Sequence, residues 1–273
     1  FVLPAVGSIR SCRMDADAYP LPNISTDLTG QVALVTGATS GLGRRFARVL
    51  AASGAQVIAA GRRRERLDEV VAEIEGAGGS AAGVEIDMTD TDSILAGVDA
   101  AEAAFGTVTI LVNNAGVPDA QRAHKMSIEL IDRVFDTNLR GPYVLSCEIA
   151  RRLIEHKLPG RQINISSISA SNYDGHGAAL YSVTKAGIAR MSEVLAVEWS
   201  RNHINVNCIA PGAFHSEMMD GMLERMGDFS GAMPRKRLGD PAQLDSTLLY
   251  LCSPASDAVT GAIIKVDDGQ SPR

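Results

Sequence analysis

The stretch VALVTGATSGLG, residues 32–43, decides the fold of this chain. A short apolar run leads directly into a glycine-rich loop, and the amphipathic segment Leu42–Ser53 follows it. Glycine lets a backbone turn tightly and approach a pyrophosphate, and a helix N-terminus offers free N–H groups to an anion. The loop has two more residues between its first two glycines than Gly-x-Gly-x-x-Gly does. A strand before it and a helix after it favour a nucleotide-binding loop over an ordinary turn.

Short apolar runs alternate with amphipathic segments along the rest of the chain. This alternation predicts βαβ units, whose parallel sheet carries helices on both faces. Right-handed crossovers then make a doubly wound α/β sheet of the Rossmann type. We expect strands at Val32–Thr36, Gln56–Ala60, Ala82–Ile86, Ile110–Val112, Gln162–Ser166, Asn205–Ile209 and Ala262–Val266. We expect helices at Leu42–Ser53, Glu65–Ala77, Ser93–Ala104, Leu130–Leu158 and Leu180–Arg201.

The 273 residues show no repeat, no low-complexity segment and no second composition regime. We therefore expect one domain over residues 30–270, preceded by an N-terminal extension, residues 1–29. The chain begins with Phe1, and Met14 opens a stretch that reads like a natural start. Residues 1–13 match no part of the predicted fold, so we expect them to be non-native or upstream sequence, or the remnant of a longer leader.

Charge and composition exclude several functions. A net charge of −6 gives no basic surface for nucleic acid. No apolar run approaches the ~18 residues that span a bilayer. The cysteines are far apart and lack the Cys-x-x-Cys spacing of metal sites, so no metal is expected, and a reducing cytoplasm suits them best. They are Cys12, Cys147, Cys208 and Cys252.

Tyr181 and Lys185 lie four residues apart and so share one face of a predicted helix. A free phenol titrates near pH ~10, and a nearby cation favours the phenolate. Lys185 is therefore expected to lower the pKa of Tyr181 toward neutrality, where a phenol can transfer protons. Such a pair also occurs on solvated helix faces, so its weight comes from the motifs around it.

Further motifs follow the glycine-rich loop: an Asn-Asn-Ala-Gly segment at residues 113–116, two adjacent serines at 166 and 167, and a Pro-Gly turn at 211–212. Together with Tyr181 and Lys185 they resemble the short-chain dehydrogenase/reductase family, over nearly everything from Leu28 to Gly269. The resemblance implies reversible hydride transfer between a nicotinamide cofactor and a carbonyl or alcohol substrate, a small molecule. It implies four catalytic residues, Asn138, Ser167, Tyr181 and Lys185. Tyr181 would donate the proton and Ser167 would bind the same substrate oxygen. Lys185 would bind the ribose, and Asn138 would help to hold a water beside it.

Ser166 competes with Ser167 for the catalytic role, but one step along a strand turns the side chain to the other face. Asp87 matches the acid that touches the adenine in the family, and its alternative role is to cap the next helix. The remaining cofactor contacts come from the glycine-rich loop, the second strand end, the Asn-Asn-Ala-Gly segment and a Pro-Gly turn. The full set is Gly37, Thr39, Ser40, Gly41, Leu42, Gly43, Arg62, Arg63, Asp87, Met88, Asn114, Ala115, Gly116, Tyr181, Lys185, Pro211, Gly212, Phe214 and Ser216.

The end of the second predicted strand bears on the choice of cofactor. An acid often stands there to hold a ribose 2′-hydroxyl, but Gly61 is followed by three arginines, residues 62–64. Arginine suits a 2′-phosphate, so NADP is favoured over NAD. The neutral Ser40 removes a second basic contact, and a solvated basic helix start is the alternative.

Substrate identity stays open at this stage. Two loops, Ser169–Ala179 and His215–Arg237, are expected to cover the site. The second carries methionines at helical spacing, which either pack a lid helix or form an adaptable apolar surface. A partly apolar carbonyl compound, a sugar or polyol, and a 3-oxoacyl thioester all remain candidates.

Two other classes compete with a reductase. One is a silent nucleotide-binding sensor or scaffold, which the presence of all four catalytic residues opposes. The other is dehalogenation or epimerisation on the same scaffold. The resemblance also implies a tetramer, less often a dimer, with main contacts at Pro142–Leu153 and Val183–Trp199. The chain departs from the family's Val-Asp-Gly-Gly ending at Asp268, where a positive φ favours glycine.

Overall fold

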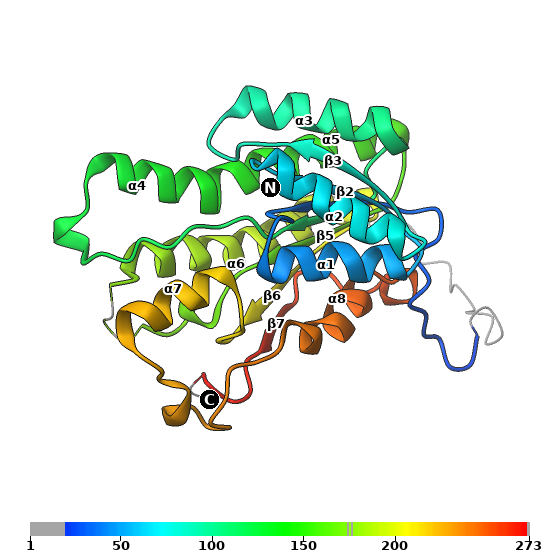
Figure 1. The fold of residues 1–273 in the computed structure, drawn as a ribbon. Coiled ribbons are helices and arrows are strands. Elements are labelled where there is room, and N and C mark those ends of the chain that lie inside the picture. The colour runs from blue at the N-terminus through cyan, green and yellow to red at the C-terminus, as the bar shows by residue number, and fades with distance from the viewer. Residues whose placement is uncertain (1–19, 174, 176, 272–273) are drawn as a thin grey trace, which may run out of the picture.

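All five residues of β1 (Val32–Thr36) are buried, because helices cover both faces of the sheet to which it belongs. The computed structural model describes residues 20–173, 175 and 177–271, and the sheet lies at its centre (Figure 1). Seven strands run parallel in the order β3-β2-β1-β4-β5-β6-β7. The other strands are β2 (Gln56–Gly61), β3 (Ser80–Glu85), β4 (Ile110–Asn113), β5 (Gly160–Ile165), β6 (Ile204–Pro211) and β7 (Ile263–Val266). The predicted doubly wound sheet is confirmed.

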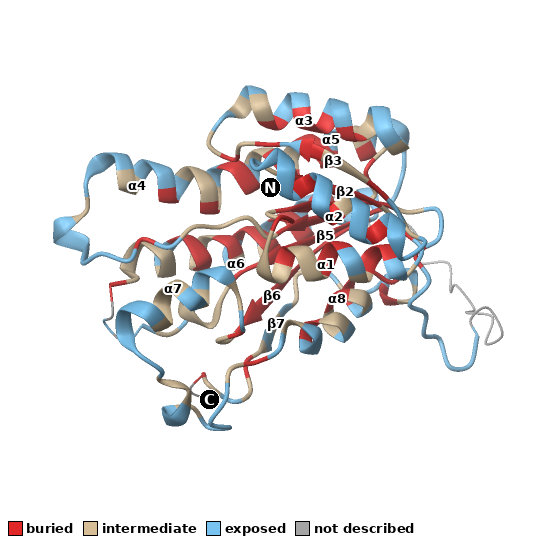
Figure 2. Ribbon diagram, in the orientation of Figure 1, coloured by how far each residue is buried: buried red, intermediate tan, exposed pale blue. Residues whose placement is uncertain are grey.

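Alternation along the strands divides the apolar side chains between two cores. Ala33 and Val35 of β1 belong to the core under one layer of helices, and Val32 and Leu34 belong to the other. The first layer consists of α1 (Gly41–Ala52), α2 (Arg64–Gly76) and α8 (Asp245–Cys252). The second consists of α3 (Thr91–Phe105), α5 (Gly141–His156) and α6 (Ala179–Trp199). Figure 2 shows the buried residues concentrated in the sheet and on the helix faces that meet it.

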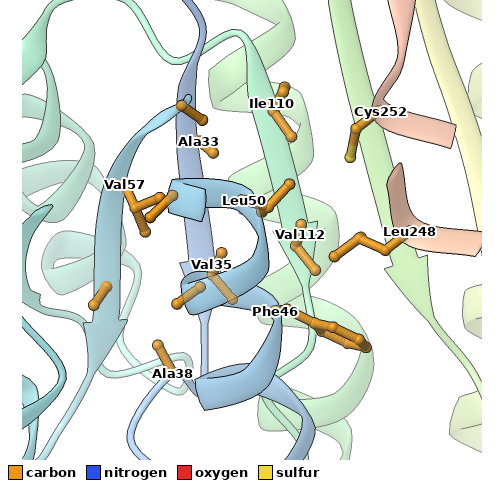
Figure 3. Packing of buried hydrophobic residues seen from close by; sticks show 14 of the residues in the cluster. Ala33, Val35, Ala38, Phe46, Leu50, Val57, Ile110, Val112, Leu248 and Cys252 are labelled. Atoms are coloured by element: carbon orange, nitrogen blue, oxygen red, sulfur yellow. The ribbon is translucent and has the colours of Figure 1, made fainter. Parts of the chain in front are cut away.

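The first core is shown in Figure 3. Phe46 and Leu50 of α1 lie with Leu248 of α8 over Val35 and Val112 of the central strands, and all are buried. Burying one side chain of this size contributes about 1.5–3 kcal/mol relative to leaving it exposed. α1 and α8, far apart in sequence, are thus held over the same strands.

The order of the strands creates a crevice at one edge of the sheet. From β1 the chain winds outward through β2 to β3, and α3 then returns it to β4 on the other side of β1. Loops leaving the ends of β1 and β4 therefore diverge. In open α/β sheets such a switch point is where ligands bind.

The segment predicted as one helix, Leu130–Leu158, is divided in three. α4 (Ile128–Phe135) leads into a π-helical turn, Asp136–Arg140, and α5 follows. The predicted helix was wrong here because the apolar spacing continues through the π turn, in which only the hydrogen-bond pattern changes. α7 (Glu217–Met226) lies in the predicted second covering loop, and α8 was not predicted.

Three further observations concern the two ends of the described chain and its helices. Leu28, just before the expected start of the domain, is buried in the first core, whereas residues 1–13 lie outside the described residues. Asp268 takes a φ of 50°, and its carboxylate pairs with Arg237 at 2.8 Å. Within the described residues, no helix combines the length and the apolar character needed to cross a membrane.

Candidate active site

A cleft of about 1240 Å³ lies over the carboxyl ends of the strands. Its wall includes the β1–α1 loop, the ends of β2, β4 and β5, the Pro211 turn and α7. Every residue predicted to bind cofactor or to act in catalysis lines it, except Gly43 and Asn138. Motifs scattered over about 180 residues of chain are thus brought together in one cleft.

The glycine-rich loop forms one end of the cleft. Gly37 and Gly41 take φ values of 65° and 51°, which other residues rarely adopt. A Cβ on Gly43 would overlap the carbonyl oxygen of Gly37, so only glycine lets α1 approach the loop this closely. Ser40 stands at the N-cap of α1 but makes no capping bond with its side chain. The first N–H groups of α1 are thus available for a pyrophosphate, which is the fit that a dinucleotide requires.

Asn113 and Asn114 form side-chain hydrogen bonds that connect the end of β4 to the segments beside it. The Asn114 amide donates to Thr36 O at 2.9 Å, which ties the start of the glycine-rich loop to the end of β4. The Asn113 amide donates to Ser146 Oγ at 2.9 Å and to Asn164 Oδ1 at 2.8 Å. These bonds connect the Asn-Asn-Ala-Gly segment, residues 113–116, to the strands and the loop beside it.

The two adjacent serines after β5 have different partners. Ser166 is buried, and its hydroxyl donates to Lys185 O at 2.7 Å. Ser167 is half-buried, lines the cleft and forms a side-chain hydrogen bond with Tyr181 that counteracts the raised pKa of that phenol. The geometry therefore assigns Ser166 to the packing of α6 and leaves Ser167 beside the phenol.

Lys185 is buried behind Tyr181 on α6. Its Nζ lies 5.6 Å from the centre of the Tyr181 ring and donates to Ile165 O at 2.7 Å. Burial lowers the pKa of Lys185 to about 8, because the ammonium loses contact with water. Lys185 thus lines the cleft while it is anchored to the end of β5.

The expected lowering of the Tyr181 pKa by Lys185 is wrong for the protein groups alone. Burial raises the pKa of Tyr181 to about 12, and the charge of Asp119 raises it further, against the hydrogen bond from Ser167. At 5.6 Å, with its own charge disfavoured by burial, Lys185 does not outweigh these effects.

Asn138 lies in the π turn, and its side-chain amide binds the backbone of the loop after β4. Its Oδ1 accepts from Val117 N at 2.8 Å, and its Nδ2 donates to Val117 O at 2.9 Å. A further bond reaches Thr184 Oγ1 at 3.3 Å. Both polar atoms of the amide thus bind protein groups, and the water-holding role predicted from the resemblance stays a prediction.

Asp119 is a site residue that the motifs did not reveal. It is buried, and its Oδ2 accepts from Leu180 N at 2.8 Å and from Tyr181 N at 3.1 Å. A carboxylate from the β4–α4 loop thereby caps α6, whose own N-cap residue, Ala178, has no side-chain oxygen. The only sequence signal was an acid three residues after Gly116.

The predicted adenosine end carries an ionic cluster. Arg62 Nη1 lies 4.0 Å from Asp87 Oδ2, and Asp87 accepts from Thr89 N at 2.9 Å. Asp90, not Asp87, caps α3, so the alternative role for Asp87 is wrong. Arg63 pairs with Glu217, the first residue of α7, which sequence reasoning missed because the pair joins positions 154 residues apart.

α7 lines the cleft onward from Glu217, which pairs with Arg63. Four methionines of this helix line it, which are Met218, Met219, Met222 and Met226. No residue of α7 is buried, and Met219 and Met222 are half-buried, which fits both a packed lid helix and an apolar surface in the cleft. Asn172 and Tyr173 also line the cleft, whereas Asp174 and His176 lie outside the described residues.

We predict different effects for two replacements of Asp119. Asp119→Ala removes the cap of α6 and should lower the free energy of unfolding by about 0.5–2 kcal/mol in urea titrations. Asp119→Asn keeps a side-chain oxygen as acceptor and should retain most of that stability. Both remove a negative charge beside Tyr181, so its pKa should fall. Alcohol oxidation needs the phenolate, and its pH profile should therefore move to lower pH. Equal stability of both variants with wild type, or a move to higher pH, would contradict this role.

Comparisons with known proteins agree with this geometry. Residues 31–226 match the model of the short chain dehydrogenase family. The 2-dehydro-3-deoxy-D-gluconate 5-dehydrogenase of Formosa agariphila is 32% identical over 89% of this chain and 93% of its own. Actinorhodin polyketide ketoreductase with NADPH superposes with a TM-score of 0.85 at 31% identity, over 92% of this chain and all of its own. The 3-ketoacyl-(acyl-carrier-protein) reductase of Brucella melitensis, in complex with NADH, gives 0.83 at 31% identity, over 90% and 100%. The chain belongs to the short-chain dehydrogenase family of NAD(P)-dependent oxidoreductases.

Proposed function

We propose that this short-chain dehydrogenase transfers hydride between NADP(H) and a carbonyl or secondary alcohol, with Tyr181 as general acid and base. The observation that carries the proposal is the meeting of Ser167 and Tyr181 in the cleft, with Lys185 buried beside the ring. A silent sensor or scaffold would not need these groups together, so the same observation opposes that alternative.

The residues of the cleft suit distinct parts of a dinucleotide. The glycine-rich loop and the start of α1 would hold the pyrophosphate, Asp87 the adenine and Lys185 the nicotinamide ribose. The Pro211 turn, with Gly212, Phe214 and Ser216, would meet the nicotinamide end. Ser216 also caps α7, because its hydroxyl accepts from Met219 N at 3.2 Å. When bound, the nicotinamide supplies or accepts the hydride.

In reduction, the Tyr181 phenol donates a proton to the substrate oxygen as negative charge develops there. The Ser167 hydroxyl donates a second hydrogen bond and orients that oxygen. A pKa of about 12 for the protein groups alone keeps Tyr181 protonated before this step. Oxidation uses the same groups in reverse, with the phenolate accepting the proton of the alcohol.

We infer that the substrate is a medium-sized, partly apolar carbonyl compound. The methionines of α7, together with Phe229 and Met233, provide an apolar wall, and thioether side chains adapt to varied apolar shapes. The relatives compared above act, by their names, on a sugar acid, a polyketide and an acyl thioester. Turnover of NADPH with matched panels of these three classes and of simple ketones distinguishes the candidates.

The preference for NADP rests on Arg62 and Arg63, which line the cleft where β2 ends without an acid. A cytoplasmic location is proposed because Cys147, Cys208 and Cys252 are free thiols. Cell fractionation tests the location.

We also propose a homotetramer that uses α5 and α6 as its main contacts. These helices expose apolar side chains to solvent, above all Val183 and Val197, which are 57% and 77% exposed. Gly187 faces Leu139 of the same chain, so it serves internal packing rather than a subunit contact.

Tyr181→Phe is predicted to lower turnover by at least ~10²–10⁴-fold, since it removes the proton donor while the ring keeps its volume. Cofactor affinity should stay within a few-fold of wild type. Lys185→Met should weaken both turnover and cofactor binding. Steady-state rates and fluorescence titration measure the two effects. Activity of Tyr181→Phe within tenfold of wild type would move the proton-transfer role to another group.

Replacing Arg62 and Arg63 with Ala should narrow the preference for NADPH over NADH by about 1–3 kcal/mol, the range for lost charged hydrogen bonds. Direct titration of both reduced cofactors measures it. Tighter binding of NADH than NADPH by the wild-type protein would show that the arginines serve another purpose.

Val197→Glu is predicted to shift the assembly to smaller species in sedimentation velocity, because a buried contact would then contain an unpaired charge. Ile24→Glu is a matched control, since Ile24 is 75% exposed and lies outside both helices. An unchanged distribution in both variants would exclude the proposed contact.

A further inference from the structure

Glu217 reaches from the first turn of α7 across to the β2–α2 loop. Its Oε1 and Oε2 accept from Arg63 Nη1 and Nη2, each at 3.2 Å, and Arg66 Nη1 lies 3.5 Å from Oε1. This is the two-point contact that a guanidinium makes with a carboxylate or with a phosphate. Arg63 thus presents its paired donors to a group of its own chain.

The same guanidinium is one of the two that the proposed function assigns to the 2′-phosphate. Arg63 Nη2 also donates to Thr39 Oγ1 at 2.8 Å and to Ser40 Oγ at 3.4 Å. These hydroxyls belong to the glycine-rich loop, and Arg63, Glu217 and the loop line one cleft. A phosphate and the Glu217 carboxylate would compete for the same two N–H groups.

Glu217 stays ionised over the whole physiological range. The hydrogen bond from Arg63, then that of Ser40, lowers its pKa to about 2. Arg66 also faces it, while the nearby acid Asp87 faces Arg62. A phosphate bound to Arg63 would therefore lie beside the full negative charge of Glu217, and the two like charges would repel each other.

The ion pair between Arg63 and Glu217 is accessible to water. The side chains of Arg63 and Glu217 are 43% and 54% exposed, so water screens their attraction. α7 itself contains no buried residue, and just before its start Ser216 faces Gly41 of the glycine-rich loop. The Glu217 pair is thus a polar tie between the methionine-lined helix and the nucleotide end of the cleft.

We propose that Glu217 is a specificity-determining residue that competes with the 2′-phosphate of NADP for Arg63, so that NADP binding releases α7. The proposal rests on the proposed NADP site. NAD, which lacks the 2′-phosphate, leaves the pair closed. Cofactor choice and the position of the substrate-covering helix are thereby coupled through one carboxylate.

The test compares Glu217→Gln with Glu224→Gln. Glu224 is an exposed acid on the same helix, so its replacement makes the same change in charge away from Arg63. Calorimetric titration with NADPH, NADH, 2′,5′-ADP and 5′-AMP separates the phosphate from the rest of the cofactor and requires no turnover. Glu217→Gln should tighten NADPH and 2′,5′-ADP by roughly three- to tenfold, since the competing state is lost. NADH and 5′-AMP should change less than twofold, and Glu224→Gln should change none of them.

The outcomes separate this proposal from the one on which it rests. If wild type prefers NADH but Glu217→Gln gains affinity for NADPH and 2′,5′-ADP, the competition stands and the wild-type NADP preference falls. If wild type prefers NADPH and the variant leaves the NADPH-to-NADH ratio unchanged, the competition is overturned. Weaker binding of 2′,5′-ADP by the variant would overturn it too, because Glu217 would then support the phosphate.

Discussion

One junction supports the whole site: the partly buried contact between Thr36 at the end of β1 and Asn114 just after β4. The Thr36 hydroxyl accepts from Asn114 N at 3.0 Å and from Ala115 N at 3.1 Å, and the Asn114 amide returns a bond to Thr36 O at 2.9 Å. The loops beyond these strands turn to opposite sides of the sheet, and these hydrogen bonds hold their first residues together. Hydrogen bonds in a low-dielectric interior are strong, and a group left unpaired there is costly. The junction therefore fixes the floor of the cleft.

The catalytic residues beside this floor are held by strands and helices. β5 pairs with β4 and brings Ser167 to the same edge, while α6 packs under the sheet and supplies Tyr181 and Lys185. Groups carried on strands and helices hold their relative positions better than groups on loops. The lid is the opposite case, because α7 has no buried side chain and depends on polar ties. Catalytic groups on packed elements thus face a cover, α7, that has no buried residue.

Sequence reasoning succeeded where a pattern repeats within one element. The central strands are continuous apolar runs because both faces are covered, and their positions were predicted to within two residues. It failed at the π turn, Asp136–Arg140, where apolar spacing is unchanged, and at α8, whose eight residues are too few for a periodic signal. Asp119 and Glu217 were missed for a different reason. Each acts on an element distant in sequence, and a single sequence carries no trace of such a pairing.

The electrostatics of Tyr181 could be judged only from the folded chain. Spacing placed a cation near the phenol, but burial acts on both groups and disfavours both charges, raising one pKa to about 12 and lowering the other to about 8. The protein by itself thus holds the phenol as a proton donor, the form that reduction of a carbonyl consumes. Oxidation needs the phenolate, and a positive charge near the ring favours it. An oxidised nicotinamide carries that charge and a reduced one does not. A bound oxidised nicotinamide would thus favour the phenolate form of Tyr181, which oxidation of an alcohol needs.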